Sequence, residues 1–170
     1  IEWATTFWIG SPTDQTDSNP GGQGMQAGGV GEVDPQKAWD ALASDTKTLL
    51  VDVRTRAEWS FVGAPDLSAL RQPVAFIEWQ SFPTMTMNGS FAADVLGAVD
   101  QTEAEEVYFI CRSGARSMSA AHATSAAAAA AGKQIACFNV AEGFEGDLNT
   151  EAKRGETDGW KARGLPWGQS

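Results

Sequence analysis

The chain has 170 residues and 42% of them are hydrophobic, which is enough for one folded domain with a modest extension. The 22 acidic and 12 basic residues give a formal net charge of -10, which argues against nucleic acid as the main partner and against an anionic membrane surface. Two cysteines and one histidine are too few for a disulfide framework or a zinc site, so we expect no metal.

No apolar run is long enough to span a bilayer. A free thiol suits a reducing compartment best, so we expect a cytoplasmic protein. Because the chain begins at Ile1 and not at Met, a removed signal peptide and a periplasmic location stay open.

Residues 1–29 are predicted to form an N-terminal arm and a linker. The arm contains Trp3, Phe7, Trp8 and Ile9, and it either packs on the domain or a neighbour or is the remnant of a membrane- or partner-binding segment. The linker is rich in Gly, Pro, Ser, Asp and Gln and lacks the apolar content to fold alone. The folded domain is therefore predicted to comprise residues 30–170.

Strand and helix patterns alternate through this domain. Predicted strands end at residue 33 and cover 48–53, 73–77, 107–110 and 134–140, whereas predicted helices or helical turns cover 35–43, 55–59, 91–99, 117–131 and 159–164. Asp34 and Pro35 indicate the start of the first helix, and Gly132 the end of the longest. The alternation predicts an α/β domain with a largely parallel sheet, whose sites lie at the carboxyl ends of the strands.

Residues 111–117 lie between a predicted buried strand and the longest predicted helix. Backbone N–H groups at a helix N-terminus are unpaired and carry a positive partial charge, so a thiolate at Cys111 is stabilised there. Arg112 and Arg116 flank the thiol and suit an anionic substrate, although one of them could instead pair with an acid. Gly114 suits a positive φ or the close approach of a substrate.

Other polar residues are given supporting roles. Ser113 and Ser117 can donate hydroxyl hydrogen bonds, and for Ser117 we favour the role of helix N-cap. Asp52, Arg54 and Glu58 form a polar set at a strand end, for which we favour a structural role. Because Arg54 and Glu58 are four residues apart, we expect an ion pair that fixes the loop.

Two segments resemble rhodanese-like domains. Residues 52–59 match the family's D-x-R-x-x-x-E-aromatic signature, and residues 111–116 are similar to its C-R-x-G-x-R active loop. The last segment of the family's domain also has similar residues in this chain, at 139–143, 159–160 and 164–166. The resemblance therefore covers about residues 30–167. It implies the rhodanese-like three-layer fold, in which a mostly parallel central sheet is flanked by helices.

The chain departs from the family pattern in two places. The family usually has G-H-[IL]-x-G-A after the signature, whereas this chain has Gly63-Ala64-Pro65-Asp66-Leu67 without the histidine, so the turn must be built differently. The acidic residues 142–158 add length before Gly159 and are a candidate rim loop that limits access to the site.

The resemblance implies a sulfurtransferase. Cys111 would take the outer sulfur of a small anionic donor, thiosulfate or a persulfide, and carry it as a covalent persulfide without any other cofactor. The acceptor would be a thiol, cyanide or a sulfur-carrier protein. Backbone N–H groups of the loop would hold the terminal sulfur. The expected substrate-binding residues are therefore Arg112, Ser113, Gly114, Ala115, Arg116 and Ser117.

Two alternatives stay open. Cysteine phosphatases and arsenate reductases share the fold, but phosphatase loops have C-x5-R, whereas Cys111 to Arg116 is C-x4-R, a tighter ring that suits a single sulfur atom. A non-catalytic rhodanese-like interaction module is the second alternative. Two further residues have less specific roles: His122 would be a general base only if it pointed back toward the loop, and Cys137 is predicted to be core.

Overall fold

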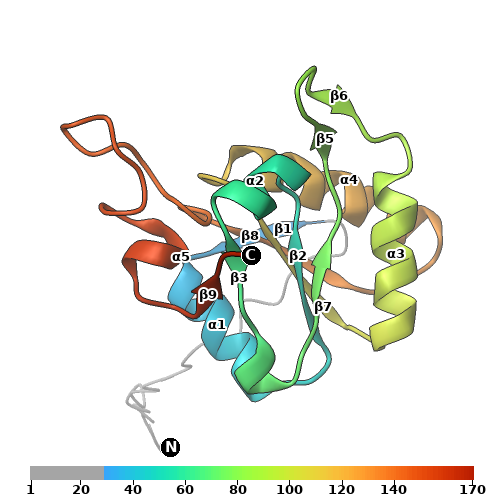
Figure 1. Ribbon diagram of the computed structural model, residues 1–170. Coiled ribbons are helices and arrows are strands. Elements are labelled where there is room, and N and C mark those ends of the chain that lie inside the picture. Colours follow the sequence, from blue (N-terminus) through green and yellow to red (C-terminus); the bar gives the residue numbers. More distant parts are fainter. Residues whose placement is uncertain (1–28) are drawn as a thin grey trace, which may run out of the picture.

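The computed structural model describes residues 29–170, so all but the last residue of the predicted arm and linker lies outside the described residues. Five strands form the central sheet in the order β1-β8-β7-β2-β4, and every neighbouring pair is parallel (Figure 1). In that order they are β1 (Val30–Val33), β8 (Ala136–Val140), β7 (Glu106–Ile110), β2 (Thr48–Asp52) and β4 (Val74–Phe76).

Helices cover both faces of this sheet and complete three layers. One face packs against α3 (Phe91–Thr102) and α4 (Ala115–Ala130), and the other against α1 (Pro35–Ser44) and α5 (Gly159–Ala162) (Figure 1). A short helix, α2 (Arg56–Phe61), follows β2. The predicted α/β architecture with a parallel sheet between helices is confirmed.

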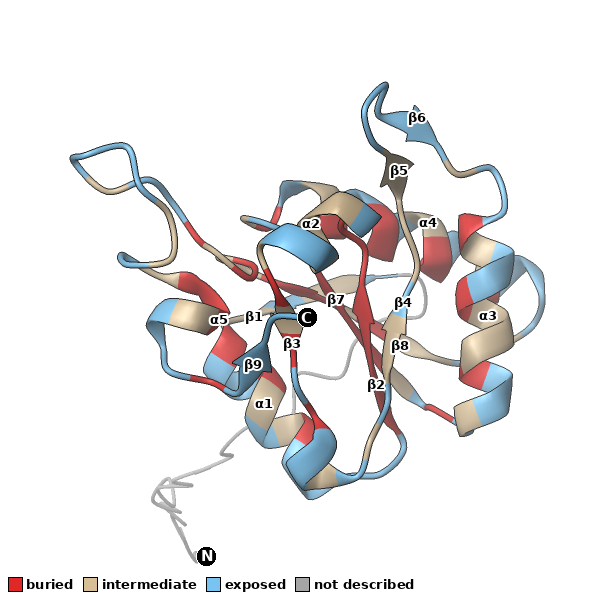
Figure 2. Cartoon of the chain, viewed as in Figure 1, coloured by how far each residue is buried: buried red, intermediate tan, exposed pale blue. Residues whose placement is uncertain are grey.

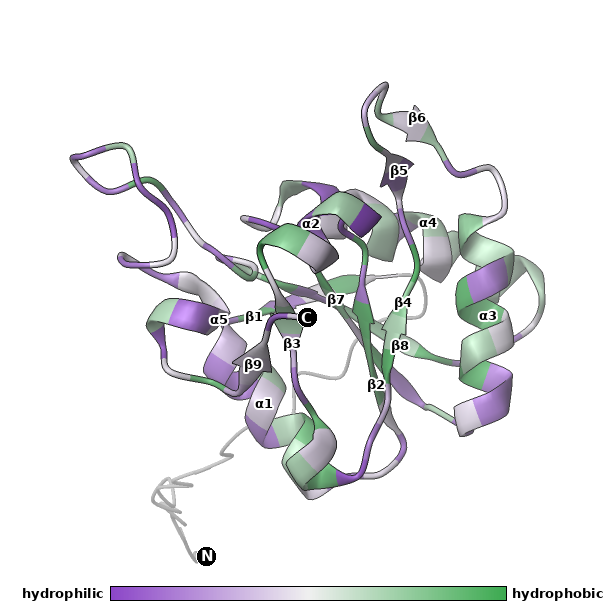
Figure 3. Ribbon diagram, in the orientation of Figure 1, coloured by the Kyte–Doolittle hydropathy of each residue, from purple (hydrophilic) through white to green (hydrophobic). Residues whose placement is uncertain are grey.

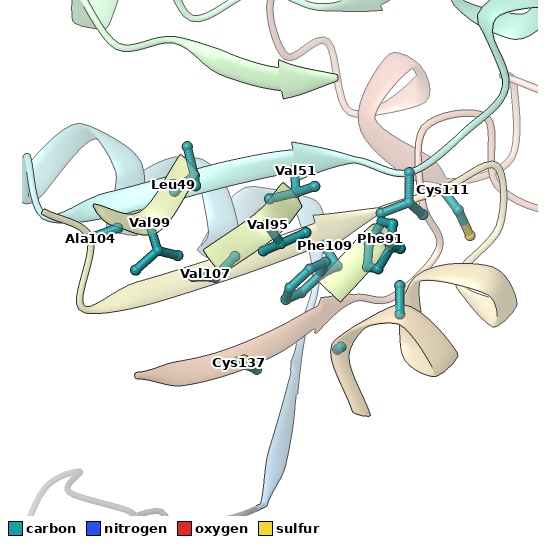
Figure 4. Packing of buried hydrophobic residues seen from close by; sticks show 13 residues of the cluster. Leu49, Val51, Phe91, Val95, Val99, Ala104, Val107, Phe109, Cys111 and Cys137 are labelled. Atoms are coloured by element: carbon teal, nitrogen blue, oxygen red, sulfur yellow. The ribbon is translucent and has the colours of Figure 1, made fainter. Parts of the chain in front are cut away.

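The central strands β2 and β7 are buried on both faces, as their continuous apolar sequences predict (Figures 2 and 3). Their side chains alternate between two cores: Leu49 and Val51 lie in the core beneath α3, while Leu50 lies in the core beneath α1. Figure 4 shows Cys111 at one end of the first core and Cys137 on the neighbouring strand. Cys111 therefore directly follows one of the two most buried strands of the sheet.

Local capping fixes where the helices begin. Asp34 accepts a hydrogen bond from the Lys37 N–H (2.9 Å) at the start of α1, as predicted. Helix α4 begins at Ala115, two residues earlier than predicted, because the chain turns into the helix at Gly114 with a φ of 101°. Gly132 follows the end of α4 with a φ of 68°, which fits its predicted terminating role.

Two small sheets and a 3-10 turn were not predicted. β5 (Gln80–Ser81) and β6 (Thr86–Met87) form an antiparallel hairpin, β3 (Ala64–Pro65) pairs with β9 (Trp167–Gly168), and residues 68–70 form the 3-10 turn. These elements have only two or three residues each, too few to show a period. Within residues 29–170, none of the helices has the length and hydropathy needed to cross a membrane.

The turn that lacks the family histidine is held by Arg54. The Gly63 carbonyl accepts a hydrogen bond from the Arg54 guanidinium (2.8 Å). Gly63 has a φ of 99°, and a Cβ there would lie 2.6 Å from the Gly168 carbonyl oxygen. A glycine is therefore required where β9 packs against this turn.

Candidate active site

The loop after β7 lies at the floor of a cavity of about 570 Å3 at the carboxyl end of the sheet. Cys111 directly follows β7, and α4 begins four residues later at Ala115. The loop residues Cys111, Arg112, Ser113, Ala115 and Arg116 line the cavity, together with residues of α2 and of the β5–β6 turn. Most of the predicted loop residues therefore share one cavity.

The other two predicted loop residues, Gly114 and Ser117, lie next to the sulfur of Cys111. Its Sγ accepts a hydrogen bond from the Gly114 N–H (3.1 Å) and lies 3.2 Å from the Ser117 hydroxyl oxygen, and Cys111 is only 1% exposed. The positive φ of Gly114 was predicted and is confirmed. The sulfur therefore lies at the N-terminal end of α4, where backbone N–H groups carry a positive partial charge.

The backbone of the same loop offers further donors to an anion. Among residues 29–170, no acceptor takes a hydrogen bond from the N–H groups of residues 112, 113, 115 and 116. These residues line the cavity, so their donors are available to a ligand beside the sulfur. We refer to the N–H groups of residues 112–116 as the loop cradle.

Ser117 does not cap the helix, contrary to the prediction. It lies in the first turn of α4, and its buried hydroxyl oxygen is 2.6 Å from Asn139 Oδ1, 3.1 Å from the Gly114 carbonyl oxygen and 3.2 Å from the Cys111 sulfur. One hydroxyl proton can satisfy only one of these acceptors at a time. Ser117 therefore faces the sulfur and Asn139 from within the first turn, whereas Gly114 occupies the N-cap position of α4.

Asn139 is a site residue that the sequence reasoning missed. It is 2% exposed on β8, and its amide nitrogen donates to Glu32 of β1 (3.0 Å) while its oxygen accepts from Ser117. The amide thus connects the hydroxyl beside Cys111 to the edge strand of the sheet. The sequence signal that could have indicated this role is an asparagine within an apolar strand, because a buried amide requires hydrogen-bonding partners.

Residues 143–146 pack against the backbone of the loop that carries Cys111 and hydrogen-bond to it. The Phe144 N–H donates to the Cys111 carbonyl (2.7 Å), and the N–H groups of Glu145 and Gly146 donate to the Arg112 carbonyl (3.0 and 3.1 Å). A Cβ on Gly143 would lie 2.5 Å from the Cys111 carbonyl oxygen. This close backbone approach explains the glycine and fixes the loop that carries the cysteine.

Arg116 pairs with Glu58 and not with a free anion. Its two terminal nitrogens donate to the two carboxylate oxygens of Glu58 (2.9 and 2.6 Å), and both side chains are 19% exposed. The predicted Arg54–Glu58 pair is wrong, because Glu58 also forms the capping box of α2 with Thr55, which turns its carboxylate toward the active loop. The ion pair links α2 to the start of α4.

The surroundings of Glu58 change its acidity. Burial alone would raise the pKa of this carboxyl, but hydrogen bonds from Arg116 and Thr55 outweigh burial and lower the pKa from 4.5 to about 2. A carboxylate of this kind stabilises the fold fully above its unfolded-state pKa, and the stabilisation is lost as the pH falls through the folded-state pKa. For Glu58 the loss extends from about pH 5 down to about pH 2.

Glu58→Gln keeps the size of the side chain and removes its charge. We expect it to lower the free energy of unfolding by about 2–3 kcal/mol at pH 7, and by roughly half as much at pH 3. Urea denaturation of both proteins at the two pH values measures the difference. An equal difference at both pH values would show that the charge of Glu58 is not what stabilises the loop.

Asp52 and Arg54 lie beneath the site rather than in it. Both side chains are fully buried and paired, with Arg54 Nη2 2.6 Å from Asp52 Oδ2, and neither lines the cavity. The Arg54 guanidinium also stacks 4.0 Å from the centre of the Phe144 ring. The structural role favoured for these two residues matches their position.

Arg112 is the cation that this loop leaves available. It is exposed, and no carboxylate in residues 29–170 forms an ion pair with its guanidinium. His122 is exposed on α4 and does not line the cavity, so it does not point back toward the loop. Cys137 is completely buried, as predicted, and burial raises the pKa of its thiol to about 12.

Residues 142–158 do not form the predicted rim of the cavity. None of them lines it, and the outer wall comes instead from Phe82 and Met85 in the β5–β6 turn. Sequence spacing could not show this, because both segments follow strands that end at the same edge of the sheet. In the part of the chain that the structure describes, no three His, Cys, Asp or Glu side chains are grouped to hold a metal ion.

Comparison with known proteins finds close relatives without an assigned function. The uncharacterized protein RC0915 of Rickettsia conorii is 37% identical over 131 residues, 77% of this chain and 91% of the relative. The uncharacterized protein RP600 of Rickettsia prowazekii is 34% identical over the same length. No family model matches the sequence.

The crystal structure of Rv0390 from M. tuberculosis superposes with a TM-score of 0.70 at 41% identity, covering 83% of this chain and 98% of Rv0390. The solution structure of a polysulfide-sulfur transferase homodimer from Wolinella succinogenes is more distant, with 18% identity and a TM-score of 0.47 over 83% of this chain and 80% of that one. The chain belongs to the same family as Rv0390 and the rickettsial proteins, and its fold is rhodanese-like.

Proposed function

We propose that the protein is a sulfurtransferase that carries a sulfane sulfur as a persulfide on Cys111. The observation that supports this most is the position of the sulfur: it lines the cavity, accepts a hydrogen bond from the Gly114 N–H, has the Ser117 hydroxyl within 3.2 Å and lies beside the unpaired donors of the loop cradle. These groups are placed to stabilise negative charge first on Cys111 and then on one added sulfur atom.

In the first half-reaction, the Cys111 thiolate attacks the outer sulfur of an anionic donor such as thiosulfate. A new S–S bond forms, the S–S bond of thiosulfate breaks, and sulfite leaves with the bonding electron pair. The loop cradle holds the terminal persulfide sulfur, and Arg112 attracts the anionic donor. In the second half-reaction, a thiol, cyanide or a sulfur-carrier protein removes the outer sulfur and regenerates the thiolate.

This chemistry needs no cofactor beyond the cysteine itself, because every step exchanges one sulfur atom between two thiophilic groups. It does need Cys111 to stay reduced. We therefore propose that the reaction takes place in a reducing compartment, of which the cytoplasm is the simplest case.

The engagement of Arg116 favours sulfur transfer over phosphoryl transfer. Each of its terminal nitrogens donates to Glu58, so a carboxylate already balances the guanidinium charge and occupies its bidentate face, which weakens its attraction for a phosphate. The ring from Cys111 to Arg116 is also one residue shorter than the phosphatase C-x5-R loop.

The protein's mass after treatment with thiosulfate tests the proposal. We expect Cys111 to gain one sulfur atom, and we expect cyanide to remove it and release thiocyanate. Initial rates with thiosulfate and cyanide should follow ping-pong kinetics. If no sulfur is gained and an aryl phosphate is turned over, the protein is a phosphatase; if neither reaction occurs, it is an interaction module.

A further inference from the structure

The cavity above Cys111 is much larger than an inorganic sulfur donor requires. Its volume of about 570 Å3 lies within the range of sites that bind whole organic molecules, about 300–1,000 Å3. Thiosulfate has only five non-hydrogen atoms and would occupy the space next to the loop cradle. The rest of the cavity is available to a second part of a larger ligand.

The outer part of the cavity is apolar. Phe82 and Met85 of the β5–β6 turn form one wall, and Ala57 and Val62, in and just after α2, contribute to the cavity as well. Phe82 is 65% exposed and Met85 is 36% exposed, although both are large and apolar. Large apolar side chains gathered at a cavity mouth typically mark a binding surface.

The hairpin that carries this wall is fixed at its base. The Trp79 N–H donates to the Val53 carbonyl (3.1 Å), and the Asn88 N–H donates to the Trp79 carbonyl (3.0 Å). Glu78 accepts from the Arg56 N–H at the start of α2 (2.8 Å). These bonds attach the hairpin to β2 and α2, so the wall has a defined position beside α2 (Figure 1).

The charged residues that line the cavity are Glu58, Arg112 and Arg116. Glu58 neutralises Arg116, whereas Arg112 and the loop cradle can attract an anion. A ligand that matches this distribution has a negatively charged sulfur at one end and an apolar organic group at the other.

Building on the proposed function, we propose that the sulfur is exchanged with an organic thiol that carries an apolar group, and that Phe82 and Met85 determine this specificity. In the exchange, the Cys111 thiolate bonds to the outer sulfur of R–S–S⁻, the S–S bond of R–S–S⁻ breaks, and its electron pair leaves with R–S⁻. The reverse reaction passes the sulfur from Cys111 to the organic thiolate. Atoms and charge balance in both directions, and no oxidant or reductant is needed.

Two acceptor thiols of similar acidity test the proposal, with thiosulfate as the donor. Phenylmethanethiol carries an apolar ring and 2-mercaptoethanol does not. We expect kcat/KM to be at least about 10-fold higher for phenylmethanethiol, since an apolar group in such a pocket changes kcat/KM by roughly 10–200-fold. The double variant Phe82→Ala/Met85→Ala should lose most of this preference, and its kcat/KM should fall further with phenylmethanethiol than with cyanide as the acceptor.

Phe61→Ala is the matched control, because Phe61 is 81% exposed on α2 and does not line the cavity. It should keep the preference for phenylmethanethiol. The inference is overturned if the wild-type protein uses both thiols equally, or if the double variant loses activity equally with cyanide and with the thiols. In both cases cyanide still discharges Cys111 of the wild-type protein, whereas a failure of the proposed function leaves the wild-type Cys111 without sulfur from the start.

Discussion

Replacing Cys111 by serine will abolish both the gain of sulfur from thiosulfate and the release of thiocyanate. A serine hydroxyl is not ionised near neutral pH and cannot hold a persulfide, so the loop cradle then has no nucleophile to assist. We expect turnover to fall by at least about 10³-fold, as for other enzymes that lose a covalent nucleophile. The measurements are the protein mass after thiosulfate treatment and the rate of thiocyanate formation.

Cys137→Ser is the matched control for this experiment. Cys137 lies in the core with no exposed surface, and burial raises the pKa of its thiol to about 12, so it is neither reachable nor ionised. The variant should keep full sulfur transfer when it is folded, at some cost in stability from a buried hydroxyl. Residual transfer by Cys111→Ser that disappears when Cys137 is also replaced would contradict the assignment.

The sequence predicts the architecture well because its signals there are physical and local. Residues 49–51 and 107–110 are apolar without interruption, which indicates burial on both faces and hence a parallel sheet between helices. The loop cysteine between a buried strand and a helix is equally local. The structure therefore differs from the prediction mainly at element ends.

The pairing of charged side chains could not be predicted in the same way. Arg54 and Glu58 have the spacing of a helical pair, but Arg54 precedes α2 and turns back to Asp52. Glu58 instead meets Arg116, which is 58 positions away in the sequence. Spacing describes neighbours along a helix only, whereas these partners are brought together by the sheet.

The cavity wall was missed for a related reason. Phe82 and Met85 lie in a turn between two strands of two residues each, where no periodic pattern exists. Only the folded chain shows that this turn reaches the cavity above Cys111. Ser117 is a second case: its hydroxyl suits a helix cap by residue type, but α4 starts two residues earlier, at Ala115, which places the hydroxyl next to the sulfur.

The buried pair of Asp52 and Arg54 should dominate the stability of the domain. Asp52→Asn leaves the Arg54 guanidinium without its counter-charge, and Arg54→Met leaves the carboxylate without its own. We expect each single variant to lower the free energy of unfolding by about 3–5 kcal/mol, the usual cost of an unpaired buried charge. Urea denaturation at pH 7 measures it.

The double variant Asp52→Asn/Arg54→Met separates the charge from the packing. It contains no buried charge, so we expect it to be less destabilised than the sum of the single variants by about 2–3 kcal/mol. Lys47→Met is the control, since Lys47 and Glu105 form an exposed pair with 54% and 64% of their side chains accessible, and we expect its unfolding midpoint in urea to stay close to that of the wild-type protein.

The sulfur-transfer activity of the double variant also tests whether the ion pair helps to position Cys111. Asp52 is paired with Ile110 across the sheet, and the Val53 N–H donates to the Ile110 carbonyl (2.9 Å), immediately before Cys111. If the double variant recovers stability and still transfers sulfur, the ion pair serves the fold alone. If the double variant recovers stability but loses sulfur transfer, the pair also fixes the end of the strand that leads into Cys111. The double variant removes the Arg54 bond to the Gly63 carbonyl as well. Single variants that cost less than about 1 kcal/mol would contradict the assignment of a buried, fully coupled pair.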